Sequence, residues 1–146
     1  MDYSKYTKQE LLRLLEVKER RPGRTPGKIY DSIAKYGLKD QEHFLVVSLD
    51  GQLNIIKVHV VTKGIVNRTM VHPREVFRPA IADNATSIVV AHNHPSNNLT
   101  ASVDDIETTQ ALIKAGRIIG IQILDHIILG VDNCSSMKEL GEVCFD

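Results

Sequence analysis

Two histidines separated by a single residue stand at the end of an apolar run in the middle of the chain. The run Ile88-Val89-Val90-Ala91 leads into His92-Asn93-His94, and Asp105 follows eleven residues after the second histidine. Residues two apart on a β-strand point to the same face, so His92 and His94 are expected to present their imidazoles together while Asn93 points away. Two imidazoles and a carboxylate are typical ligands of a catalytic zinc ion, which keeps one further position for water. The spacing therefore predicts a metal site at a strand end, with Zn²⁺ as the expected ion.

Asp105 also has an ordinary structural explanation. Ser102 and Asp105 fit a helix capping box, in which two residues three apart each accept a hydrogen bond from the backbone N–H of the other. The residues alone leave open whether Asp105 is a ligand, a capping residue or both. Ser102 is likewise a candidate both to cap the helix and to face water bound at the site.

Hydrolysis at such a site requires a carboxylate outside the coordination shell that takes up and returns a proton. Two glutamates are candidates. Glu75 lies in the first turn of an expected helix, where its ordinary role is to complement the helix dipole. Glu42 immediately precedes an expected strand, and its side chain could project across the sheet rim toward the histidines. The spacing does not decide between the two glutamates.

The elements that would position this site alternate along the chain. Helices are expected over residues 7–20, 28–37, 72–83 and 103–116, and strands over 44–49, 53–61, 86–92 and 121–129. Asp50-Gly51 indicates a hairpin turn between the first two strands. Pro79 is expected to bend or shorten the third helix, and Gly116 or Gly120 to end the fourth. The order predicts an α/β fold, in which helices pack on the faces of a mixed β-sheet.

Composition and charge limit the class of protein. The 146 residues are enough for one ordinary domain, and Lys+Arg and Asp+Glu both number 18, so the formal net charge is zero. A neutral chain is not drawn as a whole to nucleic acid or to an anionic membrane. The sequence has neither a signal peptide nor an apolar run long enough to cross a bilayer. With two cysteines, Cys134 and Cys144, expected to be reduced thiols, we expect a cytoplasmic protein.

The first 27 residues are expected to form an N-terminal helix and a basic connector, followed by one domain over residues 28–146. The segment from Lys18 to Lys28, both included, contains five basic residues and two Pro-Gly pairs. A contact with nucleic acid or an acidic partner is one interpretation of this segment. A solvated linker is favoured, because the segment lacks the interleaved aromatic side chains on which bases stack.

The motifs of the chain resemble the RadC family, the bacterial branch of the JAB1/MPN metalloprotease-like (JAMM) domains. The run His92-Asn93-His94-Pro95-Ser96, followed by Ser102-x-x-Asp105, reproduces the JAMM pattern HxHP followed by SxxD. Flanking segments similar to RadC are Gln41-Glu42-x-Phe44, His72-Pro73-Arg74-Glu75-Val76-Phe77 and Leu124-Asp125-His126-x-Ile128-x-Gly130. The resemblance covers about residues 28–132 and implies a JAB1/MPN-like fold with a cytidine deaminase-like architecture.

The resemblance also implies roles for particular residues. Those that match the zinc ligands are His92, His94 and Asp105. Ser102 matches the serine that helps polarise the substrate carbonyl and stabilise its oxyanion. Glu42 matches the upstream glutamate that acts as general acid and base, which favours it over Glu75. His126 is not a ligand in this pattern and is expected to be structural or to support a ligand. The implied function is a zinc-dependent peptidase or isopeptidase that acts on a peptide or protein substrate.

The chain departs from the RadC pattern at two positions and at its N-terminus. Asn97 stands where the family has glycine, and Ala101 where it has proline. Asparagine tolerates a left-handed backbone, so Asn97 is expected to keep the turn. RadC proteins place a helix-hairpin-helix region before this domain, for which the preceding residues are too few. The family name is linked to DNA repair, so the alternative function is a non-catalytic or DNA-associated module. A zinc nucleoside deaminase is excluded, because its HxE and CxxC motifs are missing.

Overall fold

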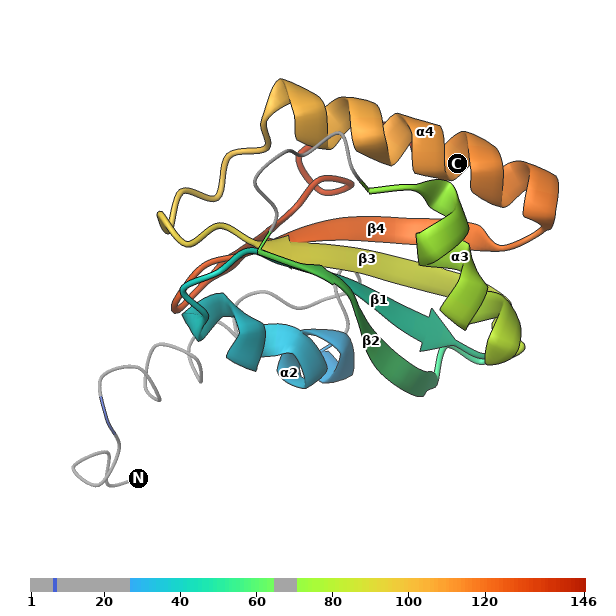
Figure 1. The fold of residues 1–146 in the computed structure, drawn as a ribbon, viewed down its shortest axis with the longest axis horizontal. Helices are drawn as coiled ribbons and strands as arrows, with labels where there is room; N and C mark the ends of the chain where they lie inside the picture. The colour runs from blue at the N-terminus through green and yellow to red at the C-terminus, as the bar shows by residue number, and fades with distance from the viewer. Residues whose placement is uncertain (1–6, 8–26, 65–70) are drawn as a thin grey trace.

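The protein is built on a mixed β-sheet. The structure is a computed structural model and describes residues 7, 27–64 and 71–146. Five strands lie in the order β2-β1-β3-β4-β5 (Figure 1). They are β1 (His43–Leu49), β2 (Ile55–Lys63), β3 (Ser87–Asn93), β4 (Gln122–Leu129) and β5 (Cys134–Ser136). β3 and β4 are parallel, and the other neighbouring strands are antiparallel.

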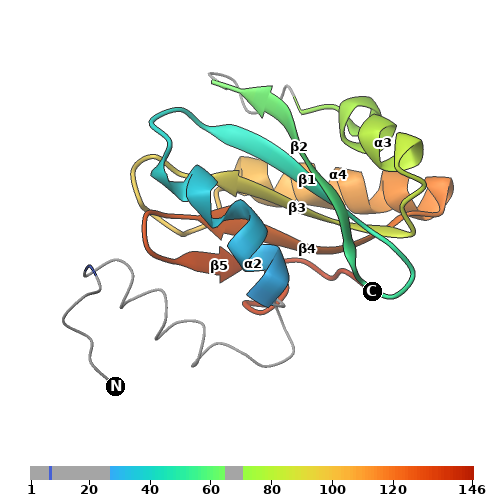
Figure 2. The same cartoon turned by 90° about the horizontal axis from the view of Figure 1, so that it is seen from below.

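Helices cover both faces of this sheet. The helices are α2 (Gly27–Ile33), the 3-10 turn η1 (Ala34–Leu38), α3 (Pro73–Ala82) and α4 (Val103–Ile119). α3 and α4 lie on one face, and α2 crosses the other, as Figure 2 shows from below. Along β3, Ile88 and Val90 pack into the core under α3 and α4, whereas Val89 and Ala91 pack into the core under α2. This explains why the β3 sequence is continuously apolar, and the expected α/β fold is confirmed.

The segment before β1 differs from the expected helix over 28–37. α2 ends at Ile33, and a tight 3-10 turn follows. Gly37 lies in that turn against the backbone of Gly130, where a Cβ on Gly37 would lie only 2.0 Å from the Gly130 oxygen. Only glycine permits this close approach, so the chain is held against the sheet just before it enters β1.

The hairpin between β1 and β2 forms as predicted but is longer than a two-residue turn. One carboxylate oxygen of Asp50 accepts hydrogen bonds from the N–H groups of Gln52 and Asn54, each at 2.9 Å. Leu53 takes the left-handed conformation with φ of 64°. The loop therefore has five residues, 50–54, and β2 begins at Ile55.

Further differences concern the ends of elements. α4 continues to Ile119 and ends at Gly120, whose φ of 89° matches a glycine cap. α3 continues through Pro79 to Ala82, so the proline does not end the helix there. The short strand β5 was not predicted. The expected helix over 7–20 and the basic connector lie outside the described residues, apart from Thr7, Gly27 and Lys28. Within the described part of the chain, no helix combines the length and apolarity that a membrane span requires.

Candidate metal site

The two motif histidines meet at the C-terminal end of β3. Nε2 of His92 lies 2.8 Å from Nε2 of His94. His94 follows the last residue of β3, but its N–H donates to the Leu129 oxygen of β4 at 3.0 Å, which keeps the strand direction. Both histidine side chains are buried, with His92 2% and His94 6% exposed. The predicted common orientation of the two imidazoles is confirmed.

Asp105 contacts both histidines from the first turn of α4. Its two carboxylate oxygens lie 3.3 Å from Nε2 of His92 and 3.3 Å from Nε2 of His94. The same carboxylate accepts the Ser102 N–H at 2.8 Å, while the Asp105 N–H donates to the Ser102 hydroxyl at 3.0 Å. Asp105 therefore takes part in the capping box and contacts the histidines at the same time. The capping hydrogen bonds hold its carboxylate in the position from which it contacts the two rings. Burial raises the pKa of the Asp105 carboxyl, but the two neighbouring histidines outweigh burial and hold that pKa well below its usual value.

The sheet register brings Glu42 to the same place. β1 and β3 are antiparallel, with Phe44 opposite His92, so a residue just before β1 lies beside the end of β3. Oε1 of Glu42 is 3.9 Å from Nε2 of His92. One oxygen of Glu42 and one nitrogen from each of His92 and His94 lie within 4.8 Å of one another. Glu75, in contrast, is exposed in the first turn of α3.

Asn93 holds the segment that contains Glu42. Its side chain points away from the two histidines, as predicted, and accepts the His43 N–H at 2.6 Å. The Asn93 amide also donates to the backbone oxygens of Gln41, at 3.0 Å, and Lys39, at 3.3 Å. The residues on both sides of Glu42 are thus tied to β3. Sequence reasoning missed this role, although a buried amide at the end of an apolar strand must find hydrogen-bond partners.

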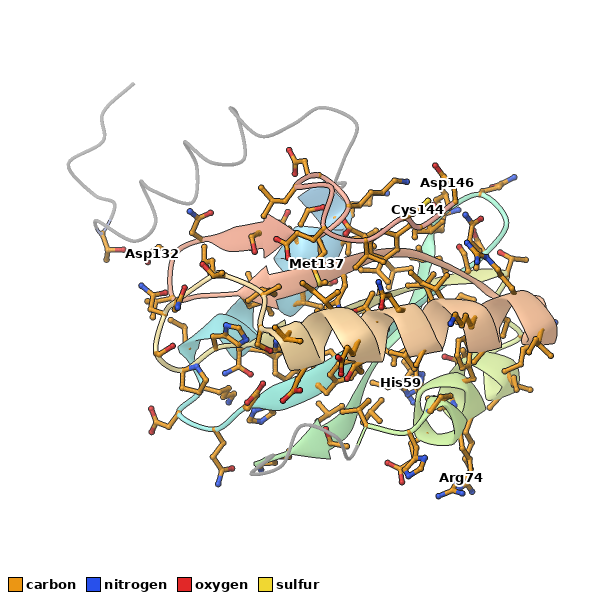
Figure 3. All side chains as sticks on the ribbon, turned by 90° about the horizontal axis from the view of Figure 1, so that it is seen from above. His59, Arg74, Asp132, Met137, Cys144 and Asp146 are labelled. Carbon is orange, nitrogen blue, oxygen red and sulfur yellow. The ribbon has the colours of Figure 1, made fainter. Side chains whose placement is uncertain are left out.

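A second layer of polar residues lies behind His92. His126 and Thr109 are both fully buried. Nε2 of His126 lies 2.7 Å from Nδ1 of His92, and the Thr109 hydroxyl lies 2.5 Å from Nδ1 of His126. Met137 lies under α4, with its sulfur 3.8 Å from the same hydroxyl (Figure 3). Burial lowers the pKa of His126 well below its usual value. Thr109 was not identified from the sequence, because nothing in the local pattern of α4 separates it from an ordinary helix residue.

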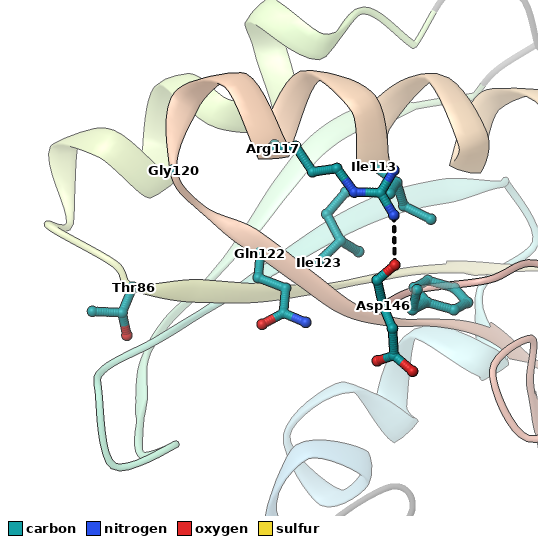
Figure 4. Close-up of a pocket in the computed structure, with 9 residues that line it drawn as sticks. Thr86, Ile113, Arg117, Gly120, Gln122, Ile123 and Asp146 are labelled. Atoms are coloured by element: carbon teal, nitrogen blue, oxygen red, sulfur yellow. Dashed lines mark hydrogen bonds between the residues drawn. The ribbon is translucent and has the colours of Figure 1, made fainter.

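Another hollow in the described structure is unrelated to this site. A cavity of about 420 Å³ opens at the opposite ends of β3 and β4, among residues that include Thr86, Gln122 and Phe145. Arg117 crosses it to donate to the backbone oxygen of Asp146 at 2.7 Å (Figure 4). Open α/β sheets bind ligands outside the carboxyl ends of their strands, which is where the histidines lie and this cavity does not.

Comparison with known proteins agrees with this arrangement. The model of the RadC-like JAB domain family matches residues 24–142. The chain belongs to the RadC-like JAB domain family. A UPF0758 protein of Methanospirillum hungatei is 47% identical over 103 residues, which are 70% of this chain and 46% of that relative. A UPF0758 protein of Syntrophomonas wolfei is 38% identical over 130 residues, 86% of this chain and 55% of the relative. The chain spans about half the length of the curated relatives that it matches.

Within this RadC-like JAB domain, the unusual Asn97 has a clear structural role. Its φ of 64° is left-handed, as predicted for the position where the family motif has glycine. Its side-chain oxygen accepts the Val131 N–H at 2.8 Å, and the Ser135 hydroxyl donates to the Leu99 oxygen at 2.7 Å. The loop after the histidines is therefore fixed to the connection between β4 and β5. Ala101 packs against the core under α4.

The donor atoms of the RadC-like JAB domain fit a divalent metal. Ligands at about 2.0–2.1 Å from a tetrahedral zinc ion lie about 3.3 Å from one another. Asp105 lies at that separation from both histidines, and the two Nε2 atoms are somewhat closer, at 2.8 Å. Nδ1 of His94 lies 2.6 Å from the Asn98 carbonyl oxygen, which can only accept, so Nε2 of His94 keeps its lone pair. Asp105 and Glu42 are both near enough to the histidines to be the third ligand.

Proposed function

We propose that this RadC-like JAB domain is a zinc-dependent hydrolase that cleaves an amide bond in a peptide or protein substrate, with JAMM-type peptidase or isopeptidase chemistry. The observation that supports it most strongly is the convergence of two imidazole nitrogens and the Asp105 carboxylate within 3.3 Å at the end of β3, with Glu42 beside them. Membership of the family is consistent with this proposal.

His92, His94 and Asp105 would hold the ion. Asp105 is preferred to Glu42 as the third ligand because it lies 3.3 Å from each Nε2, whereas the Glu42 oxygen is 3.9 Å from that of His92. A zinc ion bound there would polarise the substrate carbonyl and lower the pKa of a bound water molecule to about 7.

Glu42 is the proposed general acid and base. Its side chain is 10% exposed, so the carboxylate is partly shielded but open to a water molecule and a substrate. It would take the proton from the attacking water and return it to the leaving amine. Asn93 holds the flanking backbone, so the carboxylate is kept at a fixed distance from the histidines.

Ser102 is the proposed oxyanion group. Its hydroxyl oxygen accepts the Asp105 N–H, so the hydroxyl proton can be donated to the developing charge on the substrate carbonyl oxygen. The location at the start of α4 adds the positive end of the helix dipole.

The test is to measure zinc per protein and cleavage of a panel of peptides and isopeptide-linked peptides. Glu42→Gln should retain zinc and lower the cleavage rate by about 10²–10⁴-fold, because the proton acceptor is lost. Glu75→Gln is the matched control and should leave the rate unchanged. Zinc that is missing from the folded protein, or retained when His92 and His94 are both replaced by alanine, would contradict the proposed site.

Zinc binding without cleavage of any member of the panel would contradict the hydrolase assignment. It would favour the non-catalytic alternative instead. A DNA-associated role would depend on the basic segment over residues 18–28, of which 18–26 lie outside the described residues.

A further inference from the structure

Three short contacts connect the far side of the His92 ring to the backbone of α4. His92 Nδ1 lies 2.7 Å from His126 Nε2, and His126 Nδ1 lies 2.5 Å from Thr109 Oγ1. Thr109 Oγ1 lies 2.6 Å from the backbone oxygen of Asp105. His126 and Thr109 are both 0% exposed, so the protein itself must supply the protons of these contacts.

The direction of each hydrogen bond follows from the end at Asp105. A backbone carbonyl only accepts, so the single proton of the Thr109 hydroxyl must lie on its contact with the Asp105 oxygen. Nδ1 of His126 then has to donate to the Thr109 oxygen. A neutral imidazole has one N–H, so Nε2 of His126 accepts, and the proton in that contact comes from Nδ1 of His92. Nε2 of His92 is left with its lone pair, on the side of His94.

We propose that Thr109 and His126 are positioning residues that fix His92 in the tautomer able to bind a metal through Nε2. This inference rests on the proposed zinc site. Histidine ligands generally donate their other ring N–H to a carboxylate, a carbonyl or water, which sets both tautomer and ring orientation. His94 has the ordinary arrangement, with Nδ1 at the Asn98 oxygen, whereas the acceptor for His92 is another histidine.

Asp105 closes this network into a ring. Its side chain contacts Nε2 of His92, and its backbone oxygen orients Thr109, which orients His126, which orients His92 from behind. The first turns of α4 therefore determine the position of one proposed ligand and the protonation of another. A change in how α4 begins should alter both together.

Zinc affinity of the full chain, measured by competition with a chelator, tests the proposal. Thr109→Val keeps the shape of the side chain but cannot accept from His126, which is then free to move its proton to Nε2 and reverse the tautomer of His92. Zinc should bind about 10–100-fold more weakly, the usual effect of losing such a supporting group. Thr109→Ser, which keeps the hydroxyl, should bind zinc as the wild type does. Thr108→Val, one residue earlier on α4, is the matched control. An unfolding transition is measured for each metal-free variant, to show that the proteins compared are folded.

The tautomer itself is the second readout, and its measurement in the wild type does not depend on any variant folding. Nitrogen-15 NMR of the metal-free wild type should show the neutral His92 ring protonated on Nδ1. Thr109→Val should move that proton to Nε2. Protonation of wild-type His92 on Nε2, or equal zinc affinity in Thr109→Val and wild type, would overturn the inference. Wild-type protein that binds no zinc would refute the proposed function. In that case, a wild-type His92 protonated on Nδ1 would still support the hydrogen-bond directions inferred for His92, His126 and Thr109.

Discussion

Replacing Asp105 by glutamate separates the two roles that its carboxylate has in the structure. Glutamate is a usual residue at the third position of a capping box, so Asp105→Glu can still accept the Ser102 N–H. One extra methylene moves the carboxylate by about 1.5 Å, a single carbon–carbon bond. Metal–ligand distances tolerate only about 0.2 Å, so the 3.3 Å contacts with the two histidines cannot be kept in the same geometry.

Two measurements then separate the two roles: the free energy of unfolding reports the capping role, and zinc affinity reports the ligand role. Asp105→Ala should lower the free energy of unfolding of the metal-free protein by about 0.5–2 kcal/mol, the usual cost of losing a cap. Each kcal/mol corresponds to roughly 2–4 °C in Tm for a domain of this size. Asp105→Glu should retain most of that stability. Both variants should lose more zinc affinity than the roughly 10–100-fold that follows loss of a supporting group.

Asp104 provides the control, because it is an exposed aspartate in the same turn of α4. Asp104→Glu should change neither zinc affinity nor stability. Wild-type zinc affinity in Asp105→Glu would refute the ligand role of Asp105. Unchanged stability in Asp105→Ala would refute the energetic importance of the capping box.

Three further predictions concern stability. Asn97→Ala should lower the free energy of unfolding by about 2 kcal/mol, since it loses the hydrogen bond to Val131 and places alanine in a left-handed conformation. Asn97→Gly should lose only the hydrogen bond. Equal denaturation midpoints for the two variants would contradict this prediction. A hydrogen bond from His59 holds the pKa of Asp83 below its ordinary value, so the stabilisation is present above about pH 4 and is lost as the pH falls through the lowered pKa. The difference in unfolding free energy between wild type and Asp83→Asn should therefore be about 0.2–1 kcal/mol at neutral pH and shrink on acidification, and a difference that grew in acid would show the opposite sign. Phe77→Ala, at a core position only 1% exposed, should cost about 3–5 kcal/mol in urea unfolding, and a loss below 1 kcal/mol would mean that the core under α3 is loosely packed.

The part of the site that depends on local periodicity could be predicted from the sequence. Alternation along a strand placed His92 and His94 on one side, and a capping pattern placed Asp105 at the start of α4. Glu42 could not be chosen over Glu75 from spacing, because its position depends on the antiparallel register of β1 and β3, which joins residues about fifty apart. Only the family resemblance favoured it.

The supporting residues were hidden from the sequence for a related physical reason. The role of Asn93 depends on backbone groups just before and at the start of β1, and that of Thr109 on a ring in β4. A side chain of either type is common in helices and at strand ends, and only tertiary contacts give it a function. The short strand β5 was missed because three residues are too few to show an alternating pattern.

In the proposed site, three residues hold a zinc ion while Glu42 lies outside its coordination shell. The most direct measurement is a crystal structure of the zinc-loaded chain, with anomalous scattering recorded at the zinc edge. We expect one peak at about 2.0–2.2 Å from Nε2 of His92, Nε2 of His94 and one oxygen of Asp105, with Glu42 contacting a water molecule at the fourth position. A peak coordinated by Glu42 in place of Asp105, or no peak among these residues, would contradict it.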